Sequence, residues 1–194
     1  YNVAIGIQAL GAGVVTDGTG SQGRHNIAIG HSVLDALTTG CNNTAIGCDV
    51  MTSMTVGKNN VGIGNSAMGS VTTGAAENNV AIGISAMAGS ASTTGASNVA
   101  IGNAAMDALT TGNYNVGLGT NALGAATTGS DNIGIGRAGL GGTLTGADNI
   151  GIGRATANAL TSGACNVALG LNALGASTDG CDNIAIGNAA MGAS

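Results

Sequence analysis

The sequence contains no Pro, Trp or Phe, and its only aromatic residues are Tyr1 and Tyr114. Hydrophobic residues still make up 44% of the chain, so they are almost all Ala, Val, Ile, Leu and Met. Without large side chains, a wide globular core is hard to fill at native packing density, whereas a thin core lined by a few aliphatic residues per layer is not. The composition therefore favours a narrow fold.

Charge is also scarce. Charged residues make up 7% of the chain, and four Lys or Arg stand against nine Asp or Glu, for a formal net charge of -5. Binding to nucleic acid through phosphates needs clustered Lys and Arg, and a transmembrane helix needs a run of about 18 apolar residues. The sequence has neither, so we expect no nucleic-acid partner and no membrane insertion within this segment.

What the sequence does contain is an internal repeat. A pentad of Asn, Val or Ile, Ala or Gly, Ile or Leu, and Gly occurs eleven times, most often 17 residues apart, and Thr44 is its one departure. Two variable residues follow each pentad, then a small residue with Leu or Met, and then Thr-Thr-Gly or a near relative. Residues 1–194 are therefore predicted to form a single repeat array of eleven coils.

Each coil is predicted to hold two short strands joined by two glycine corners, which gives an all-β parallel β-solenoid of about 17-residue coils. Alternation with period two places the second and fourth pentad residues on one strand face, which we assign to the core with the later Leu or Met. The Ala or Gly on the other face predicts the close approach of another backbone. Ile135 is then inside and Asn121 is on the surface.

Two kinds of residue are predicted to shape the corners. The Gly that closes each pentad and the Gly of Thr-Thr-Gly are expected to have positive φ. In the coil that has Ala157 in place of Leu or Met, Leu160 is expected to fill the gap. The leading Asn residues are predicted to stack as a side-chain amide ladder that satisfies turn backbone; they are Asn26, Asn43, Asn60, Asn79, Asn98, Asn115, Asn132, Asn149, Asn166 and Asn183.

Three intervals are longer than the rest, those after Asn2, Asn60 and Asn79. The extra residues must bulge from a corner without changing the register, and residues 17–23 are the loop that we expect to contact a ligand. Because the sequence opens and stops inside a repeat, we expect it to be an interior segment of a longer fibrous protein.

The Asn-Val-Ala-Ile-Gly pentad, followed by Ala-Leu and Thr-Thr-Gly, resembles the head repeats of trimeric autotransporter adhesins. It resembles even more closely the longer repeats of bacterial and phage tail-fibre-like proteins. The resemblance covers essentially the whole chain, although the coil is longer than the usual adhesin-head coil. It implies a left-handed β-roll, three copies of which pack side by side as a homotrimeric fibre on a bacterial cell surface or a virion. A host-surface glycan or protein would be the receptor.

The titratable residues are too few and too scattered to predict a catalytic, cofactor or metal site, and we expect no enzymatic activity. The histidines, His25 and His31, are interpreted as solvated corner residues. Cys41 and Cys48 show no metal-type spacing, nor do the other two cysteines. Those two, Cys165 and Cys181, occupy adjacent turn positions in neighbouring coils and could form a disulfide.

Carboxylates recur before the Asn of several pentads. Single carboxylates one coil apart are too few for a calcium shell, and the nonapeptide of calcium-binding β-rolls is absent. Asp131 and Asp148 are each followed six residues later by an arginine, Arg137 and Arg154. We predict that each pair forms a surface ion pair.

The predicted function is that of an extracellular fibre shaft or head, which spaces or presents a receptor-binding end as a surface adhesin or viral tail fibre does. Two alternatives stay open. The chain could be a self-assembling extracellular filament subunit, because uncapped solenoid ends expose strand edges. It could also be an ice-binding solenoid, because Thr recurs at the corners, as at Thr38 and Thr110.

Overall fold

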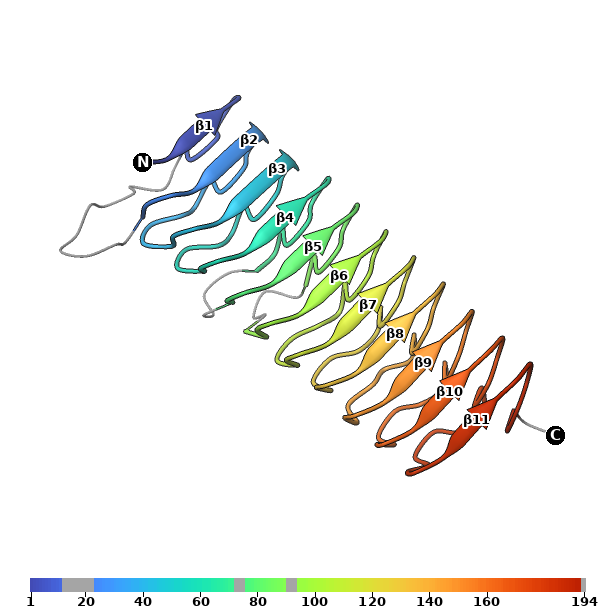
Figure 1. Ribbon diagram of the computed structural model, residues 1–194. Coiled ribbons are helices and arrows are strands. Elements are labelled where there is room, and N and C mark those ends of the chain that lie inside the picture. Colours follow the sequence, from blue (N-terminus) through green and yellow to red (C-terminus); the bar gives the residue numbers. More distant parts are fainter. Residues whose placement is uncertain (12–22, 72–75, 90–93, 193–194) are drawn as a thin grey trace.

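The computed structural model describes residues 1–11, 23–71, 76–89 and 94–192. Across these ranges, eleven parallel strands form one sheet whose spatial order follows the sequence order, which confirms the predicted all-β parallel β-solenoid. Figure 1 shows the strands side by side along a rod. With neighbouring strands about 4.8 Å apart, the sheet is roughly 50 Å long. The strands are β1 (Val3–Ile5), β2 (Ile27–His31), β3 (Thr44–Cys48), β4 (Val61–Ile63), β5 (Val80–Ile82), β6 (Val99–Ile101), β7 (Val116–Leu118), β8 (Ile133–Ile135), β9 (Ile150–Ile152), β10 (Val167–Leu169) and β11 (Ile184–Ile186).

Each strand pairs with the next at equivalent pentad positions. The register is kept across the longer intervals, since Val3 pairs with Ile27, and Val61 pairs with Val80, which in turn pairs with Val99. The insertions therefore leave the sheet unchanged, as predicted. The loop at 17–23, which we expected to contact a ligand, lies outside the described residues except for its last residue.

Two columns of aliphatic side chains fill the interior. The Leu or Met eight residues after the Asn is buried from Leu34 to Leu174, as predicted, and Met106 and Leu123 are examples. In the two end coils, Leu10 is only partly buried and Met191 is exposed. A second column stands eleven residues after the Asn and includes Leu37, Leu109 and Leu160. Leu160 is buried as expected, but it belongs to this column and does not replace a missing residue of the first.

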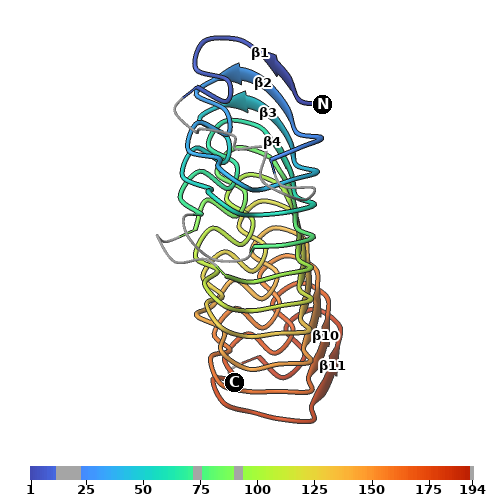
Figure 2. The same ribbon diagram turned by 90° about the vertical axis from the view of Figure 1, so that its left-hand side faces the viewer.

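The described part of each coil has one strand, so the prediction of a second strand is wrong. Figure 2 shows the loops of successive coils stacked along the rod. In these loops the residues six and eight positions after the Asn have positive φ, as at Asn121 (54°) and Leu123 (51°), whereas strands need negative φ. Coils are still hydrogen-bonded there, because the Leu123 N–H donates to the Gly139 carbonyl at 3.0 Å.

The Gly that closes each pentad has positive φ, as predicted, for example 111° at Gly136. A Cβ on Gly136 would lie 2.6 Å from the carbonyl oxygen of Gly153 in the next coil, so glycine is needed for both conformation and space. The same prediction is wrong for the Gly of Thr-Thr-Gly. Gly112 does not have positive φ. Glycine is needed there because a Cβ would collide with the Gly129 carbonyl. Positive φ falls instead on the residue before the Asn, as at Tyr114 (58°).

Candidate interaction surface

The two faces of the strands are the reverse of those predicted. The small third residue of the pentad points into the coil, and Ala100 and Ala168 are fully buried. The second and fourth residues point outward and are half-buried or exposed; Ile101 is 40% exposed. The assignment of Ile135 to the core is therefore wrong, because it is half-buried on the outward face, whereas the surface position of Asn121 is confirmed.

The inward residue is small because it packs against the opposite side of its own coil and against the Leu of the preceding coil. A Cβ on Gly134 would lie 2.6 Å from the Gly139 carbonyl oxygen and 3.1 Å from Cγ of Leu123. A Cβ on Gly151 would lie 2.8 Å from Cγ of Leu140. Close packing within one chain therefore sets the residue size, and the small face is not a surface that another copy approaches.

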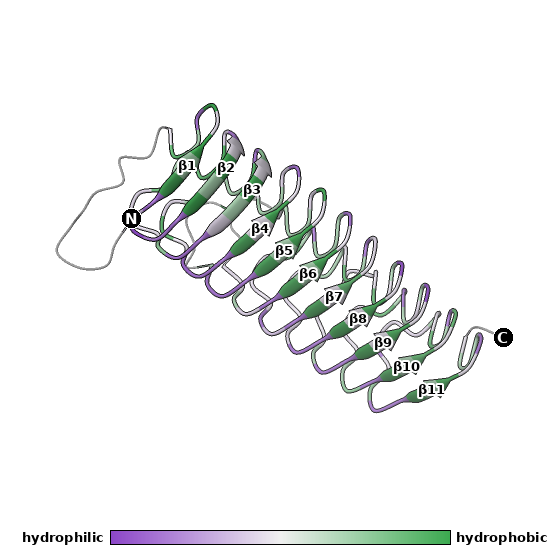
Figure 3. Ribbon diagram, turned by 45° about the horizontal axis from the view of Figure 1, so that its top comes forward, coloured by the Kyte–Doolittle hydropathy of each residue, from purple (hydrophilic) through white to green (hydrophobic). Residues whose placement is uncertain are grey.

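The outward side chains form a continuous apolar surface, which we call the strand face. Figure 3 shows the strands in mostly hydrophobic colours, with β3, which begins at Thr44, as the paler exception, and with hydrophilic residues at the corner where the strands begin. At about 50 Å long and 10 Å wide, the strand face covers roughly 500 Å². Patches of that size on a monomer are often functional. The strand face consists of Val3, Ile5, Ile27, Ile29, Thr44, Ile46, Val61, Ile63, Val80, Ile82, Val99, Ile101, Val116, Leu118, Ile133, Ile135, Ile150, Ile152, Val167, Leu169, Ile184 and Ile186.

The predicted Asn ladder holds the start of every strand in place. The backbone N–H of Asn115 donates to Oδ1 of Asn98 at 2.9 Å, and its Nδ2 donates to the same oxygen at 3.1 Å and to the Gly129 carbonyl at 2.9 Å. The N–H to Oδ1 bond recurs between neighbouring coils along the whole series. The strands of the strand face are therefore preceded by a network of hydrogen-bonded Asn residues, which are buried from Asn26 to Asn166.

The two variable residues after each pentad stack along the rod at the corner where the strands end. We call this strip of paired positions the variable corner. Near the end of the array it carries Arg137 and Arg154, which line a shallow hollow of about 380 Å³ together with the amides of Asn121 and Asn172. Two guanidinium groups and two amides give the hollow many hydrogen-bond donors.

The ion pairs predicted for these arginines are not formed. Among the described residues, neither Arg137 nor Arg154 has a carboxylate within ion-pair distance. The reason is the strand between them: Asp131 precedes β8 and Arg137 follows it, so the two side chains lie at opposite ends of the same strand. The arginine hollow is therefore positively charged.

The disulfide considered for Cys165 and Cys181 is not present either, because both residues are exposed free thiols. Desolvation raises the pKa of the Cys165 thiol, and the carboxylates of Asp182 and Asp148 raise it further. A neutral thiol is the poorer nucleophile, so the raised pKa lowers the reactivity of Cys165 near neutral pH.

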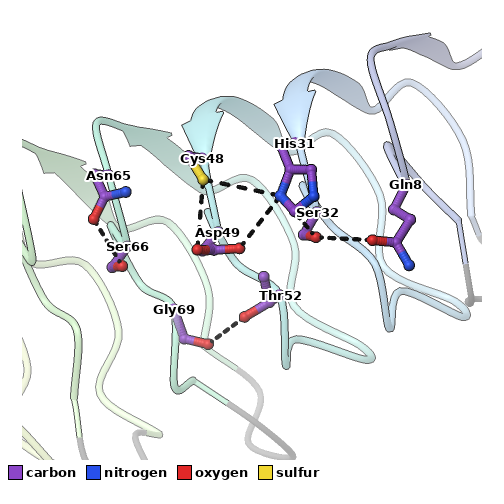
Figure 4. A network of polar contacts seen from close by, with 9 residues as sticks. All are labelled: Gln8, His31, Ser32, Cys48, Asp49, Thr52, Asn65, Ser66 and Gly69. Carbon is purple, nitrogen blue, oxygen red and sulfur yellow. Dashed lines mark hydrogen bonds and ion pairs between the residues drawn. The ribbon is translucent and has the colours of Figure 1, made fainter.

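The structure brings together three residues that sequence reasoning left apart, His31, Cys48 and Asp49 (Figure 4). His31 and Cys48 are both the fifth residue after a pentad Asn and are 17 residues, or one coil, apart. Comparing equivalent positions of neighbouring coils, in place of local spacing, would have found them.

The corner threonines connect neighbouring coils. The hydroxyls of Thr38, Thr110 and Thr161 each donate to a backbone carbonyl of the next coil, at 3.0, 2.8 and 2.8 Å. Thr therefore recurs at this corner because its hydroxyl links one coil to the next.

Comparisons with protein-family models, curated proteins and solved structures found no match to this chain. Within the described ranges there is no helix of the length and hydropathy that crossing a membrane requires.

Proposed function

We propose that the chain is a structural and adhesive fibre subunit, which packs side by side with further copies of itself through the strand face in a homotrimeric extracellular rod. The observation that carries this proposal is the strand face, which is apolar at every position except Thr44. A continuous apolar surface of this size is costly to leave in water. Burying it in an assembly removes that cost.

A second copy of the chain is the partner that matches the strand face best. Its rows of side chains repeat at the strand spacing of about 4.8 Å, so the rows of one copy can fit between those of another at every coil. A partner whose side chains lack this spacing would fit against only a few coils. The strand face carries no charged residue, so identical surfaces meet without repulsion in spite of the net charge of -5.

The size of the strand face favours a closed assembly. Roughly 500 Å² per copy is less than the ~800 Å² per partner of a standard interface. Three copies around one axis let each strand face contact two neighbours and leave no apolar surface open. The number three comes from the resemblance to trimeric adhesin heads, and placement on a bacterial cell surface or a virion comes from the same resemblance.

We place the receptor contact at the variable corner. Arg137 and Arg154 have no carboxylate partner there, and guanidinium groups bind carboxylate and phosphate or sulfate groups with two parallel hydrogen bonds. An acidic group on a host-surface glycan or protein fits this chemistry.

The mass of the soluble particle, measured by light scattering with negative-stain microscopy of the same sample, tests the assembly. About three times the chain mass of 18.1 kDa, seen as short rods, is the expected result. A monomer at all concentrations would contradict the proposal. Long filaments would instead make end-to-end self-assembly the function.

A further inference from the structure

A cluster of three metal-ligating side chains lies on the variable corner where β2 and β3 end. Nδ1 of His31 is 3.8 Å from Oδ1 of Asp49 and 3.9 Å from Sγ of Cys48, and that Sγ is 3.5 Å from Oδ2 of Asp49. Figure 4 shows the three side chains turned toward one another from two neighbouring coils. One donor atom from each residue lies within 4.8 Å of the other two.

These separations are close to those of a tetrahedral zinc site. Zinc binds imidazole nitrogen and carboxylate oxygen at about 2.0 Å and thiolate sulfur at about 2.3 Å, which puts the donor atoms roughly 3.3–3.6 Å apart. Small side-chain rotations would close the cluster around one ion. His31 and Asp49 are 54% and 51% exposed, so the side chains have room to rotate and the ion has access from solvent.

The backbone holds the cluster in position. β2 and β3 have five residues where the other strands have three, and the extension pairs His31 directly with Cys48. The Asp49 N–H donates to the His31 carbonyl at 3.0 Å, which fixes the residue after the strand as well. The three ligands therefore come from two neighbouring coils whose backbones are already paired, so no backbone ordering is needed on binding.

We propose that His31, Cys48 and Asp49 form a zinc-binding site, with a fourth coordination position left for water or an external ligand. The donor set selects the metal class, because thiolate and imidazole suit zinc, whereas calcium and magnesium take oxygen donors. One thiolate and one carboxylate also balance the two positive charges of the ion. Zinc sites with three protein ligands keep the fourth coordination position open for a water molecule or another ligand.

The hydrogen bonds around the cluster are compatible with ion binding. Without metal, the Cys48 thiol donates to Asp49, and zinc would take the place of that proton, which is released to solvent. The Ser32 hydroxyl lies 3.1 Å from Nδ1 of His31 and donates to Oε1 of Gln8 at 3.2 Å. While Ser32 donates to Gln8, the lone pair on Nδ1 remains available to the metal.

The test is a titration of the metal-free, reduced chain with Co²⁺, followed by displacement with Zn²⁺. The expected result is one ion per chain with a thiolate-to-cobalt charge-transfer band, which Zn²⁺ abolishes. Cys48→Ser should lose the band. His31→Ala and Asp49→Asn should lower zinc affinity by more than the roughly 10- to 100-fold that loss of a residue supporting a ligand costs. His25→Ala and Cys165→Ser are the matched controls and should behave as the wild type.

A second measurement uses only the wild-type chain, so it does not depend on how the variants fold. Zinc should protect Cys48 from alkylation, mapped by mass spectrometry, and leave Cys165 and Cys181 as reactive as before. No charge-transfer band in the wild type, an undiminished band in Cys48→Ser, or alkylation of Cys48 at the same rate with and without zinc would each overturn the proposal.

Discussion

Oδ1 of Asn115 accepts two hydrogen bonds from Asn132 in the next coil, one from its backbone N–H at 3.0 Å and one from its Nδ2 at 3.2 Å. Asn115 in turn donates to Asn98 and to the Gly129 carbonyl. Each Asn from Asn26 to Asn166 therefore satisfies polar groups in its own coil and in both neighbours, and these Asn residues are buried.

Asn115→Ala should therefore destabilise the array strongly. It leaves the Gly129 carbonyl and the Asn132 N–H without partners, and each unsatisfied buried group costs about 1–3 kcal/mol. Urea unfolding followed by circular dichroism measures the loss. Asn103→Ala, which removes an exposed amide at a position without positive φ, is the control. Equal midpoints for the two variants would contradict the role assigned to the ladder.

Two neighbouring corner positions should respond to substitution in opposite directions. Gly136 has φ of 111°, and a Cβ there would lie 2.6 Å from the next coil's backbone, so Gly136→Ala should cost more than about 2 kcal/mol. Ala138 has φ of 53°, a left-handed conformation that costs an L-residue about 1–2 kcal/mol. Ala138→Gly should be neutral or stabilising by up to about 1 kcal/mol. Thermal melts of the two variants check this, and destabilisation by both would argue against the corner conformation.

Cys48 should react slowly with alkylating reagents in the metal-free chain. Its hydrogen bond to Asp49, together with desolvation and the Asp49 charge, raises the pKa of the Cys48 thiol. A raised pKa leaves less thiolate near neutral pH, so reaction is retarded until the pH rises through that pKa. Asp49→Asn removes the negative charge and should speed alkylation of Cys48 at pH 7, with Cys165 as the internal reference. An unchanged rate would show that Asp49 does not control the thiol.

The repeat made much of the fold predictable. Pentad spacing gave the parallel register, the Asn ladder and the bends at the closing glycines, because equivalent residues of stacked coils meet their counterparts. Period-two alternation showed that the two strand faces differ but could not say which one is inside. The deciding fact is three-dimensional: Leu123 and the Gly139 carbonyl fill the space over Gly134, so only a residue without a side chain fits there.

The sites were harder to predict for a related reason. A search for local metal-type spacing does not find His31 and Cys48, whose proximity depends on coil stacking. The predicted Asp131–Arg137 ion pair failed because six residues along the chain span a strand and place the two groups at different corners. Coil position, and not sequence distance, decides which side chains meet in this fold.

The strand face is the centre of the account, and the mass of an outward-face variant tests it most directly. Light scattering of the wild type, Ile135→Asp and Asn121→Asp at one concentration is the measurement. We predict about three times 18.1 kDa for the wild type and for Asn121→Asp. Ile135→Asp should shift toward 18.1 kDa with an unchanged circular dichroism spectrum, because a charge on the strand face blocks packing between copies but leaves the coil interior intact. An Ile135→Asp particle with the wild-type mass, or a monomeric wild type, would contradict the assignment of the strand face as the self-association surface.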